Sequence, residues 1–341
     1  MKKTKINTTQ INNNTNNANN ANNANKKIIN WSKYSNSLEN RGNFTVLLNV
    51  TYLNNTAGQT GRAGHPFTYS DALILFLAQL REFMRLPLRQ TIGMAKFILA
   101  QAAPTLQIQL PSYITLSRRL SKLNIPTHLD RINFASPIIF LPDSTGLKIS
   151  GEGEWKVKKH GADKRRTWVK VHLGVDCCTG AIVAISTTKA HVHDGSELIN
   201  LLDHVSANLP EAEISDVIAD GAYGSKANYA IARKNHLNLL VPPPKNAVWH
   251  GDIKDGELVD DPKWRERNSY VRDCWKLGRD EWKKQSGYHK RSLAETAMFR
   301  LKRSFGSRLR SRTSQNQEAE VKIRVSLLNL FTSYGLPEYA T

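Results

Sequence analysis

The sequence predicts an α/β protein in which an all-α region precedes a mixed five-stranded sheet with flanking helices. Two observations predict this fold class. Apolar residues recur with the helical period between residues 70 and 123, and with the period of strands from Pro137 onward. After Pro137 the expected order is three strands, helix, strand, helix, strand, insertion and helix. That order is typical of a mixed sheet with helices on its faces.

The N-terminal residues 1–30 are expected to be a disordered, Asn-rich tail. Repeated Asn-Asn-Ala triplets over residues 16–24 offer almost no apolar surface to bury. Folded sequence is expected to begin near Trp31.

Three short helices are predicted in the region 31–132. Ser70 precedes the apolar run DALILFLAQLREFM, a second helix is expected to start at Pro87, and the third, YITLSRRLSKL, carries Arg118 and Arg119. Three helices of which the last is basic fit a helix-turn-helix-like DNA-binding region. An ordinary helical subdomain with a solvated basic face fits the same pattern.

The first three strands are predicted as an antiparallel meander. The run IIFLPD reads as a buried strand that ends in Asp143, WVKVHLGVD alternates as a half-buried strand does, and the turn over residues 177–180 leads into AIVAISTT. A helix is expected next, with Asp194 as its N-cap and Glu197 three residues later.

The remaining elements follow the same reasoning. The run SDVIAD predicts a fourth strand that ends in Asp220, a short helix is expected over 226–236, and LNLLV predicts the fifth strand. Residues 245–287 lack a clear period and are treated as an insertion of unassigned structure. Helical character resumes at YHKRSLAETAMFRLKRSF, and residues 321–333 predict a last helix.

Charge and cysteine content narrow the class of protein. The 341 residues carry 48 Lys and Arg against 29 Asp and Glu, a formal net charge of +19, and only three cysteines. The cations cluster in residues 1–30, 155–172 and 290–312, which favours a polyanionic partner such as nucleic acid, although solvated faces without a partner remain open. No disulfide framework, zinc finger or membrane-spanning run is evident, so we expect a soluble cytoplasmic protein without a membrane partner.

Two acids follow apolar strands, Asp143 after IIFLP and Asp220 after DVIA. Ligands of open α/β sheets bind at the carboxyl ends of strands, so these side chains are expected in one crevice if their strands are neighbours. Two carboxylates that close need a cation, and oxygen-only ligands select Mg²⁺ or Mn²⁺. Taken singly, an acid in either position is more often a loop or cap residue than a catalytic one.

The helix expected to begin at Tyr288 carries a third acid, Glu295. At about 100° per residue, Tyr288, Arg291, Glu295 and Lys302 fall on one stripe roughly 60° wide. A separate apolar sector would dock this helix on the sheet; it comprises Leu293, Ala297 and Leu301. A solvent face with an Arg291–Glu295 pair explains the stripe too, but the many surrounding cations favour an acid that works beside a phosphate backbone.

These motifs carry a resemblance to a known family. LPDST around Asp143, IADGAYGS around Asp220, and the spacing Tyr288-x2-Arg291-x3-Glu295-x6-Lys302 resemble the DDE transposases of bacterial insertion sequences. GEGEWKVKKHG and KRRTW add to the likeness, and GYHKRSLAETAMFRLK resembles the IS-five family, in its nine-oh-three-like group. The likeness runs from about Trp31 to Tyr339.

The resemblance implies a fold and a chemistry. Residues 133–341 would form a ribonuclease H-like catalytic domain with an insertion at about 245–287, and residues 31–132 would recognise DNA. The catalytic and metal-binding triad would be Asp143, Asp220 and Glu295, acting with Mg²⁺ or Mn²⁺. A pair of metal ions would support cleavage at the transposon ends and attack of the freed 3′-hydroxyl on target DNA.

The resemblance also implies partners. Tyr288, Arg291 and Lys302 would contact DNA near the scissile phosphate, and Arg118 and Arg119 are expected DNA contacts in the helical region. The partners would be double-stranded DNA, as terminal inverted repeats and as target, and further copies of the chain on paired ends. The expected location is the bacterial cytoplasm, in association with the nucleoid.

Two other functions remain open on the sequence. A DNA-binding repressor descended from such an enzyme would keep the basic segments without the chemistry, and a ribonuclease H-like nuclease would stop after hydrolysis. The presence of all three acids favours an enzyme over the repressor, and the Tyr-Arg-Glu-Lys spacing favours strand transfer over simple hydrolysis.

Overall fold

The computed structural model describes residues 30–43, 68–102, 104, 108–135, 137–149, 168–254 and 257–338, and the predicted tail and most of the basic segment 155–172 lie outside them. The chain divides into two compact units. The smaller unit contains α2 (Trp31–Gly42) and residues 334–338, joined by a hydrogen bond of 2.7 Å from Arg41 Nη2 to the Gly335 carbonyl. The described residues 68–333 belong to the larger unit.

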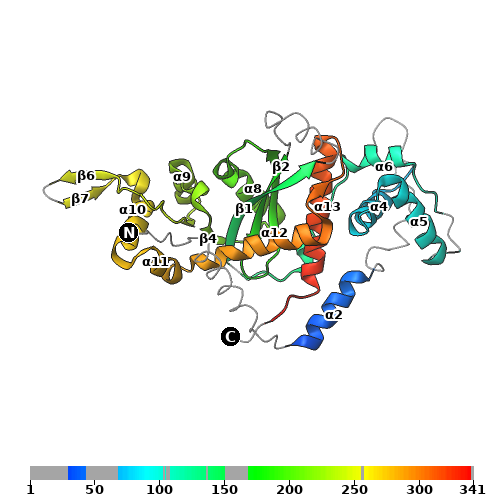
Figure 1. Ribbon diagram of the computed structural model, residues 1–341, viewed down its shortest axis with the longest axis horizontal. Coiled ribbons are helices and arrows are strands. Elements are labelled where there is room, and N and C mark those ends of the chain that lie inside the picture. The colour runs from blue at the N-terminus through cyan, green and yellow to red at the C-terminus, as the bar shows by residue number, and fades with distance from the viewer. Residues whose placement is uncertain are drawn as a thin grey trace, which may run out of the picture. The chain divides into compact units, whose positions relative to one another are not determined.

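The larger unit is built on a mixed sheet, which confirms the predicted fold class (Figure 1). The strand order is β3-β2-β1-β4-β5, with β8 (Arg308–Leu309) added beside the far end of β1. Strands β1 to β3 are antiparallel neighbours, whereas β4 runs parallel to β1 and β5 parallel to β4. The main strands are β1 (Ile138–Ile149), β2 (Trp168–Asp176), β3 (Ile182–Lys189), β4 (Ile214–Ile218) and β5 (Asn238–Leu240). The five main strands are those that the sequence predicted, and β8 is an additional short strand.

Helices pack on the sheet in two groups. The helices α8 (Leu198–Asn208) and α9 (Lys226–Lys234) share an apolar cluster with sheet residues that include Phe140 and Val217. The helices α12 (Ser292–Phe305) and α13 (Ser314–Ser333) contribute no residue to that cluster and contact β1, β2 and β3 instead. Figure 1 shows α12 and α13 lying in front of the strands.

The three helices of the predicted N-terminal region are present. They are α4 (Asp71–Phe83), α5 (Leu88–Ala102) and α6 (Tyr113–Leu120). The Ser70 side chain caps α4 as expected, by accepting a hydrogen bond from the Leu73 amide. These helices pack on one another, and α4 also packs on α13. Among the described residues, no helix is long and apolar enough to cross a membrane.

Several expected boundaries are wrong. Strand β1 continues six residues past Asp143 because it stays paired with β2 as far as Lys148. Asp194 is not the N-cap of α8, because it forms an ion pair with Lys170. The ring of His193 caps the 3₁₀ turn Asp194–Glu197 by accepting from the Gly195 amide, and α8 begins only after that turn. The last helix begins at Ser314, seven residues earlier than expected.

The insertion 245–287 has structure of its own. It contains the hairpin β6 (Gly251–Lys254) and β7 (Glu257–Asp260), followed by α10 (Arg265–Leu277) and α11 (Arg279–Gln285). Asp260 holds the hairpin to α10 through a bidentate ion pair with Arg272 and a hydrogen bond from Asn268. Polar contacts of this kind leave no apolar period in the sequence.

Candidate active site

The strand register brings Asp143 and Asp220 together. Strands β1 and β4 are parallel neighbours, and the last paired residues are Phe140 and Val217. Asp143 and Asp220 each lie three residues beyond that pair, so they occupy equivalent places where the two strands separate. The structure thereby confirms that their strands are neighbours.

The Asp143 carboxylate is largely enclosed, with 15% of its side chain exposed. Its Oδ1 accepts a hydrogen bond of 2.8 Å from the Ser144 amide, and its Oδ2 accepts one of 3.0 Å from Arg291 Nη1. Burial raises the pKa of Asp143 above its ordinary value, against the effect of the Ser144 amide and Arg291. The nearby charges of Asp220 and Glu295 raise this pKa further, which places all three acids within electrostatic reach of one another.

Glu295 reaches the same place from the first turn of α12. The Arg291 guanidinium donates to its Oε1 as well as to Asp143, and so links two of the three acids. The Glu295 side chain is 58% exposed, so this acid faces the solvent side of the site. The helix is docked on the sheet by buried apolar residues, namely Ala294, Ala297, Met298, Leu301 and Phe305.

The expected helical stripe is corrected in one respect. Tyr288 and Arg291 belong to a 3₁₀ turn (Tyr288–Arg291), and α12 begins only at Ser292. Leu293, expected on the docking face, is 39% exposed, because the change of helical geometry gives that place to Ala294. Arg291 and Glu295 nevertheless meet as the stripe predicted.

Asp220 and Tyr288 complete the inner part of the site. Asp220 Oδ1 accepts a hydrogen bond of 2.9 Å from the Ala222 amide and so caps the turn Gly221–Tyr223. Tyr288 is half-buried, and its ring centroid lies 6.3 Å from that of Trp282. Burial raises the pKa of Tyr288, Arg291 lowers it and Asp220 raises it, so the phenol lies within electrostatic reach of both groups.

The donor set fits a hard divalent cation. Three carboxylates lie within electrostatic reach of one another, and Arg291 supplies a positive charge to two of them in this structure. Within the described ranges, no three His, Cys, Asp or Glu side chains are already arranged to hold a metal ion. The oxygen donors are therefore suitable, while two of the acids are bridged by a guanidinium.

The other predicted DNA contacts differ in how far their side chains are exposed to solvent. Lys302 is half-buried on α12, two turns after Glu295, and Arg118 is exposed on α6. Arg119 is buried: it pairs with Asp71 and donates to the Tyr69 carbonyl, which ties α6 to the start of α4. Of the two arginines, we therefore keep Arg118 alone as a candidate DNA contact.

Of two further polar groups near the acids, the sequence reasoning missed Tyr223 and assigned Asp194 only as a helix cap. The Tyr223 hydroxyl is fully buried and has no hydrogen-bond partner among the described residues, and burial followed by the charges of Asp194 and Asp143 raises its pKa. Asp194 Oδ1 lies 2.9 Å from Lys170 Nζ. The position of Tyr223, three residues after Asp220, was the only sequence signal for its place in the site.

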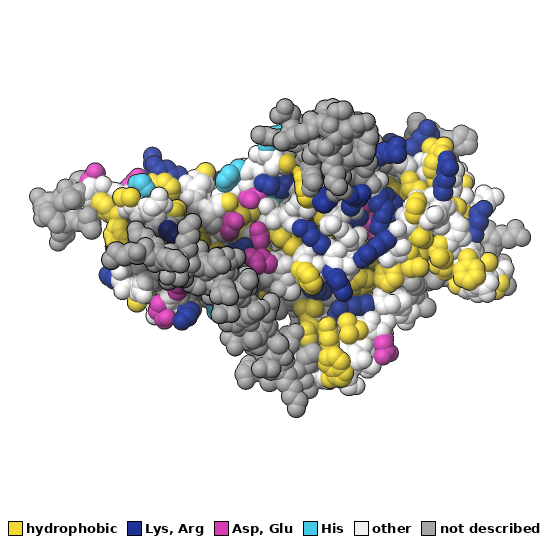
Figure 2. Space-filling view, viewed as in Figure 1, with side chains coloured by type: hydrophobic (Ala, Val, Ile, Leu, Met, Phe, Trp, Pro, Cys, Tyr) yellow, Lys and Arg dark blue, Asp and Glu magenta, His cyan; other side chains and the backbone are white. Residues whose placement is uncertain are grey.

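Cations gather beside the acids on the molecular surface. Figure 2 shows acidic side chains over the start of α12 and many Lys and Arg side chains over the rest of α12 and over α13. On α12 the cations after Glu295 are Arg300, Lys302 and Arg303. A polyanion can therefore lie over this face while one of its phosphates reaches the acids.

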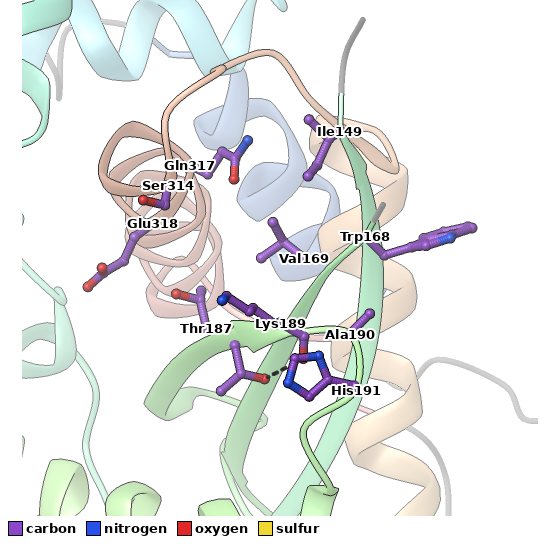
Figure 3. Close-up of a pocket in the computed structure, with 11 residues that line it drawn as sticks. Ile149, Trp168, Val169, Thr187, Lys189, Ala190, His191, Ser314, Gln317 and Glu318 are labelled. Carbon is purple, nitrogen blue, oxygen red and sulfur yellow. Dashed lines mark hydrogen bonds between the residues drawn. The ribbon is translucent and has the colours of Figure 1, made fainter. Parts of the chain in front are cut away.

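A separate pocket opens beside the first residues of β2 and the last residues of β3 (Figure 3). Its lining includes Trp168, Lys189, His191 and Glu318, and also Ile149, which lies about 20 Å along β1 from Asp143 at the rise of an extended strand. The pocket is therefore distinct from the acidic site.

Comparison with known proteins assigns the part of the chain that holds the acids to a described family. The family model "Transposase DDE domain" matches residues 135–330, more than half of the chain, and a second model of the same description matches residues 39–152. The first match contains all three acids.

Similarity to solved structures is distant. A Drosophila P element transposase strand transfer complex is 12% identical, with a TM-score of 0.32, over 86% of this chain and 85% of that one. A Mos1 transposase paired-end complex is 13% identical, with a TM-score of 0.23, over 72% and 82%. A simian T-cell lymphotropic virus intasome is 12% identical, with a TM-score of 0.25, over 72% and 66%. The family assignment therefore depends on the domain match.

Proposed function

The chain belongs to the family of transposases with a DDE domain, and from this premise we propose that Asp143, Asp220 and Glu295 catalyse DNA cleavage and strand transfer. As a member of that family it is a polynucleotidyl transferase. The proposed reaction is cleavage at the ends of a mobile element, followed by attack of the freed 3′-hydroxyl on target DNA.

One observation carries the proposal. Three acids that are far apart in the sequence gather where β1 and β4 separate, Asp143 and Asp220 through the strand register and Glu295 through its shared contact with Arg291. A structural role alone does not explain why partly buried carboxylates gather at a place where burial and mutual repulsion raise the pKa of Asp143.

The residues of the chain prepare the site for a phosphodiester. A bound divalent cation, which we propose to be Mg²⁺ or Mn²⁺, supplies charge stabilisation and activates the attacking oxygen. The Ser144 and Ala222 amides fix one oxygen each of Asp143 and Asp220, which orients the opposite oxygens. The guanidinium of Arg291 is a planar, bidentate donor suited to a phosphate, and it interacts with the Tyr288 phenol.

DNA is the proposed partner over a wider surface. Lys302 and the cations of α12 would bind the backbone near the scissile phosphate, and Arg118 on α6 would contribute within the helical region 31–132. We propose that the chain recognises terminal inverted repeats and works as an oligomer on paired ends. Assignment to the IS-five family, in its nine-oh-three-like group, and a place at the bacterial nucleoid complete the proposal.

The proposal is tested by single-turnover cleavage of a labelled duplex that carries the element's end. Asp143→Asn, Asp220→Asn and Glu295→Gln should each lower the cleavage rate by at least about 10³-fold, with end binding reduced no more than about threefold. Asp203→Asn is the matched control, because Asp203 is an exposed acid on α8. Cleavage at the wild-type rate by any of the three variants would refute the assignment.

A further inference from the structure

Arg291 occupies the oxygens that a metal ion would need. Its Nη1 lies 3.0 Å from Asp143 Oδ2, and its Nη2 donates to Glu295 Oε1. The other Asp143 oxygen already accepts from the Ser144 amide at 2.8 Å. Each Asp143 oxygen therefore accepts one hydrogen bond, and the positive charge of Arg291 lies against Oδ2, where it opposes a second cation at the same oxygen.

The guanidinium is well held in this position. Its side chain is 20% exposed, and that of Asp143 is 15% exposed, so water screens their attraction only in part. Burial disfavours the charge on Arg291, yet the surrounding groups Tyr288, Asp143 and Glu295 outweigh it and raise the pKa of this arginine. Arg291 thus stays charged at every physiological pH and offsets one of the negative charges of the acids.

We propose that Arg291 is a resident counter-ion, which holds Asp143 and Glu295 together in the DNA-free protein and is displaced when a divalent cation binds. The inference rests on the proposed function, because it takes these carboxylates to be the metal ligands. The inference goes beyond that function because it states that Arg291 cannot keep its contacts with Asp143 and Glu295 while a metal ion binds these two acids.

Displacement follows from charge and from geometry. A divalent cation needs carboxylate oxygens at about 2.0–2.2 Å and repels a guanidinium bound to the same atoms. Arg291 belongs to a short 3₁₀ turn before α12, so its side chain can leave the acids while Glu295 stays fixed by the helix. Once free, the same two-pronged donor faces the phosphates that the cations of α12 attract.

A functional consequence is that the site resists metal ions until DNA arrives. A phosphate that binds the guanidinium removes the competitor from Asp143 and Glu295, so DNA and the cation help each other to bind. The DNA-free protein should therefore bind the cation more weakly than its three carboxylates would otherwise allow.

The test is calorimetric titration of the full-length, DNA-free protein with MnCl₂. Arg291→Gln keeps a polar side chain of similar length without the charge, and its Mn²⁺ affinity should rise by about tenfold or more, as expected when a charge-assisted contact no longer competes. Arg291→Lys keeps the charge without the fork, and its affinity should lie between the other two. Arg303→Ala, which removes an exposed cation of the same helix, should change the affinity by less than about threefold.

A second readout is thermal unfolding. Without metal, Arg291→Gln should unfold at a lower temperature than the wild type, because it leaves Asp143 and Glu295 without a positive partner, and Mn²⁺ should raise its unfolding temperature more than that of the wild type. Unchanged or weaker Mn²⁺ binding by both Arg291→Gln and Arg291→Lys would overturn the inference.

Failure of this inference is distinguishable from failure of the proposed function. If Asp143→Asn and Glu295→Gln weaken Mn²⁺ binding while both Arg291 variants leave it unchanged, only the counter-ion role is lost. If the two acid variants bind Mn²⁺ as tightly as the wild type, the carboxylates are not the metal ligands and both proposals fail.

Discussion

Removal of the Glu82 carboxylate should destabilise the larger unit severely. Glu82 lies in α4 and is 0% exposed, and its Oε2 accepts from Arg324 Nε at 2.8 Å and from Arg310 Nη1 at 3.2 Å. Arg81 Nη1 lies 3.4 Å from its Oε1. Arg324 on α13 is itself 0% exposed, so Glu82→Ala leaves a buried guanidinium with Glu320 as its remaining acid.

The expected magnitude follows from this burial. Breaking a buried ion pair by removing one partner costs about 3–5 kcal/mol, because the other charge stays buried. Glu320 still accepts from Arg324, so we expect a value near the lower limit, about 3 kcal/mol. That is a large part of the roughly 5–15 kcal/mol by which a domain is stable.

Urea unfolding followed by circular dichroism measures this loss. Glu318→Ala is the matched control, because Glu318 lies on α13, is 48% exposed and forms an i,i+4 pair with Lys322. The control should cost no more than about 0.5 kcal/mol. A loss below about 1 kcal/mol for Glu82→Ala would refute the reasoning and with it the observed packing of α4 on α13.

Three further predictions concern buried groups. Tyr223→Phe should leave the free energy of unfolding unchanged or raise it by about 1 kcal/mol, because the Tyr223 hydroxyl lacks a partner among the described residues, and a clear loss in urea unfolding would contradict this. Burial raises the pKa of the Cys177 thiol, whereas Cys178 is exposed, so iodoacetamide at pH 8 should modify Cys178 first. Mass spectrometry that shows Cys177 modified first would contradict this prediction. Burial lowers the pKa of His172 below 6.5, so the unfolded chain binds the proton more readily than the folded one. The free energy of unfolding should therefore fall as the pH drops through about 6.5. The variant His172→Gln should show a smaller fall, and an unchanged pH dependence would exclude the effect.

The sheet and most of its helices could be predicted because they carry a regular apolar period. Strand β3 and helix α4 follow their apolar runs closely, and Asp220 follows β4 as expected. The insertion could not be predicted, because its hairpin is held to α10 by side-chain contacts of Asp260, which produce no periodic pattern.

The sequence indicated the acids of the candidate site, but it did not indicate that Arg291 connects two of them. The strand ends indicated that Asp143 and Asp220 would be neighbours if their strands were adjacent, and the resemblance to DDE transposases added Glu295. The Arg291 contact to Asp143 joins residues 148 positions apart, and periodicity within one helix could indicate only its pairing with Glu295. The pairing of Glu82 with Arg324, 242 positions apart, was hidden for the same reason.

A change of metal specificity tests the central claim most directly. Asp143→Cys and Asp220→Cys replace a hard oxygen by a thiolate, which Mg²⁺ binds poorly and Mn²⁺ accepts better. If these side chains are the metal ligands, each variant should lose cleavage of the element's end in Mg²⁺ and regain part of it in Mn²⁺. Cleavage by either variant in Mg²⁺ at the wild-type rate would contradict the account.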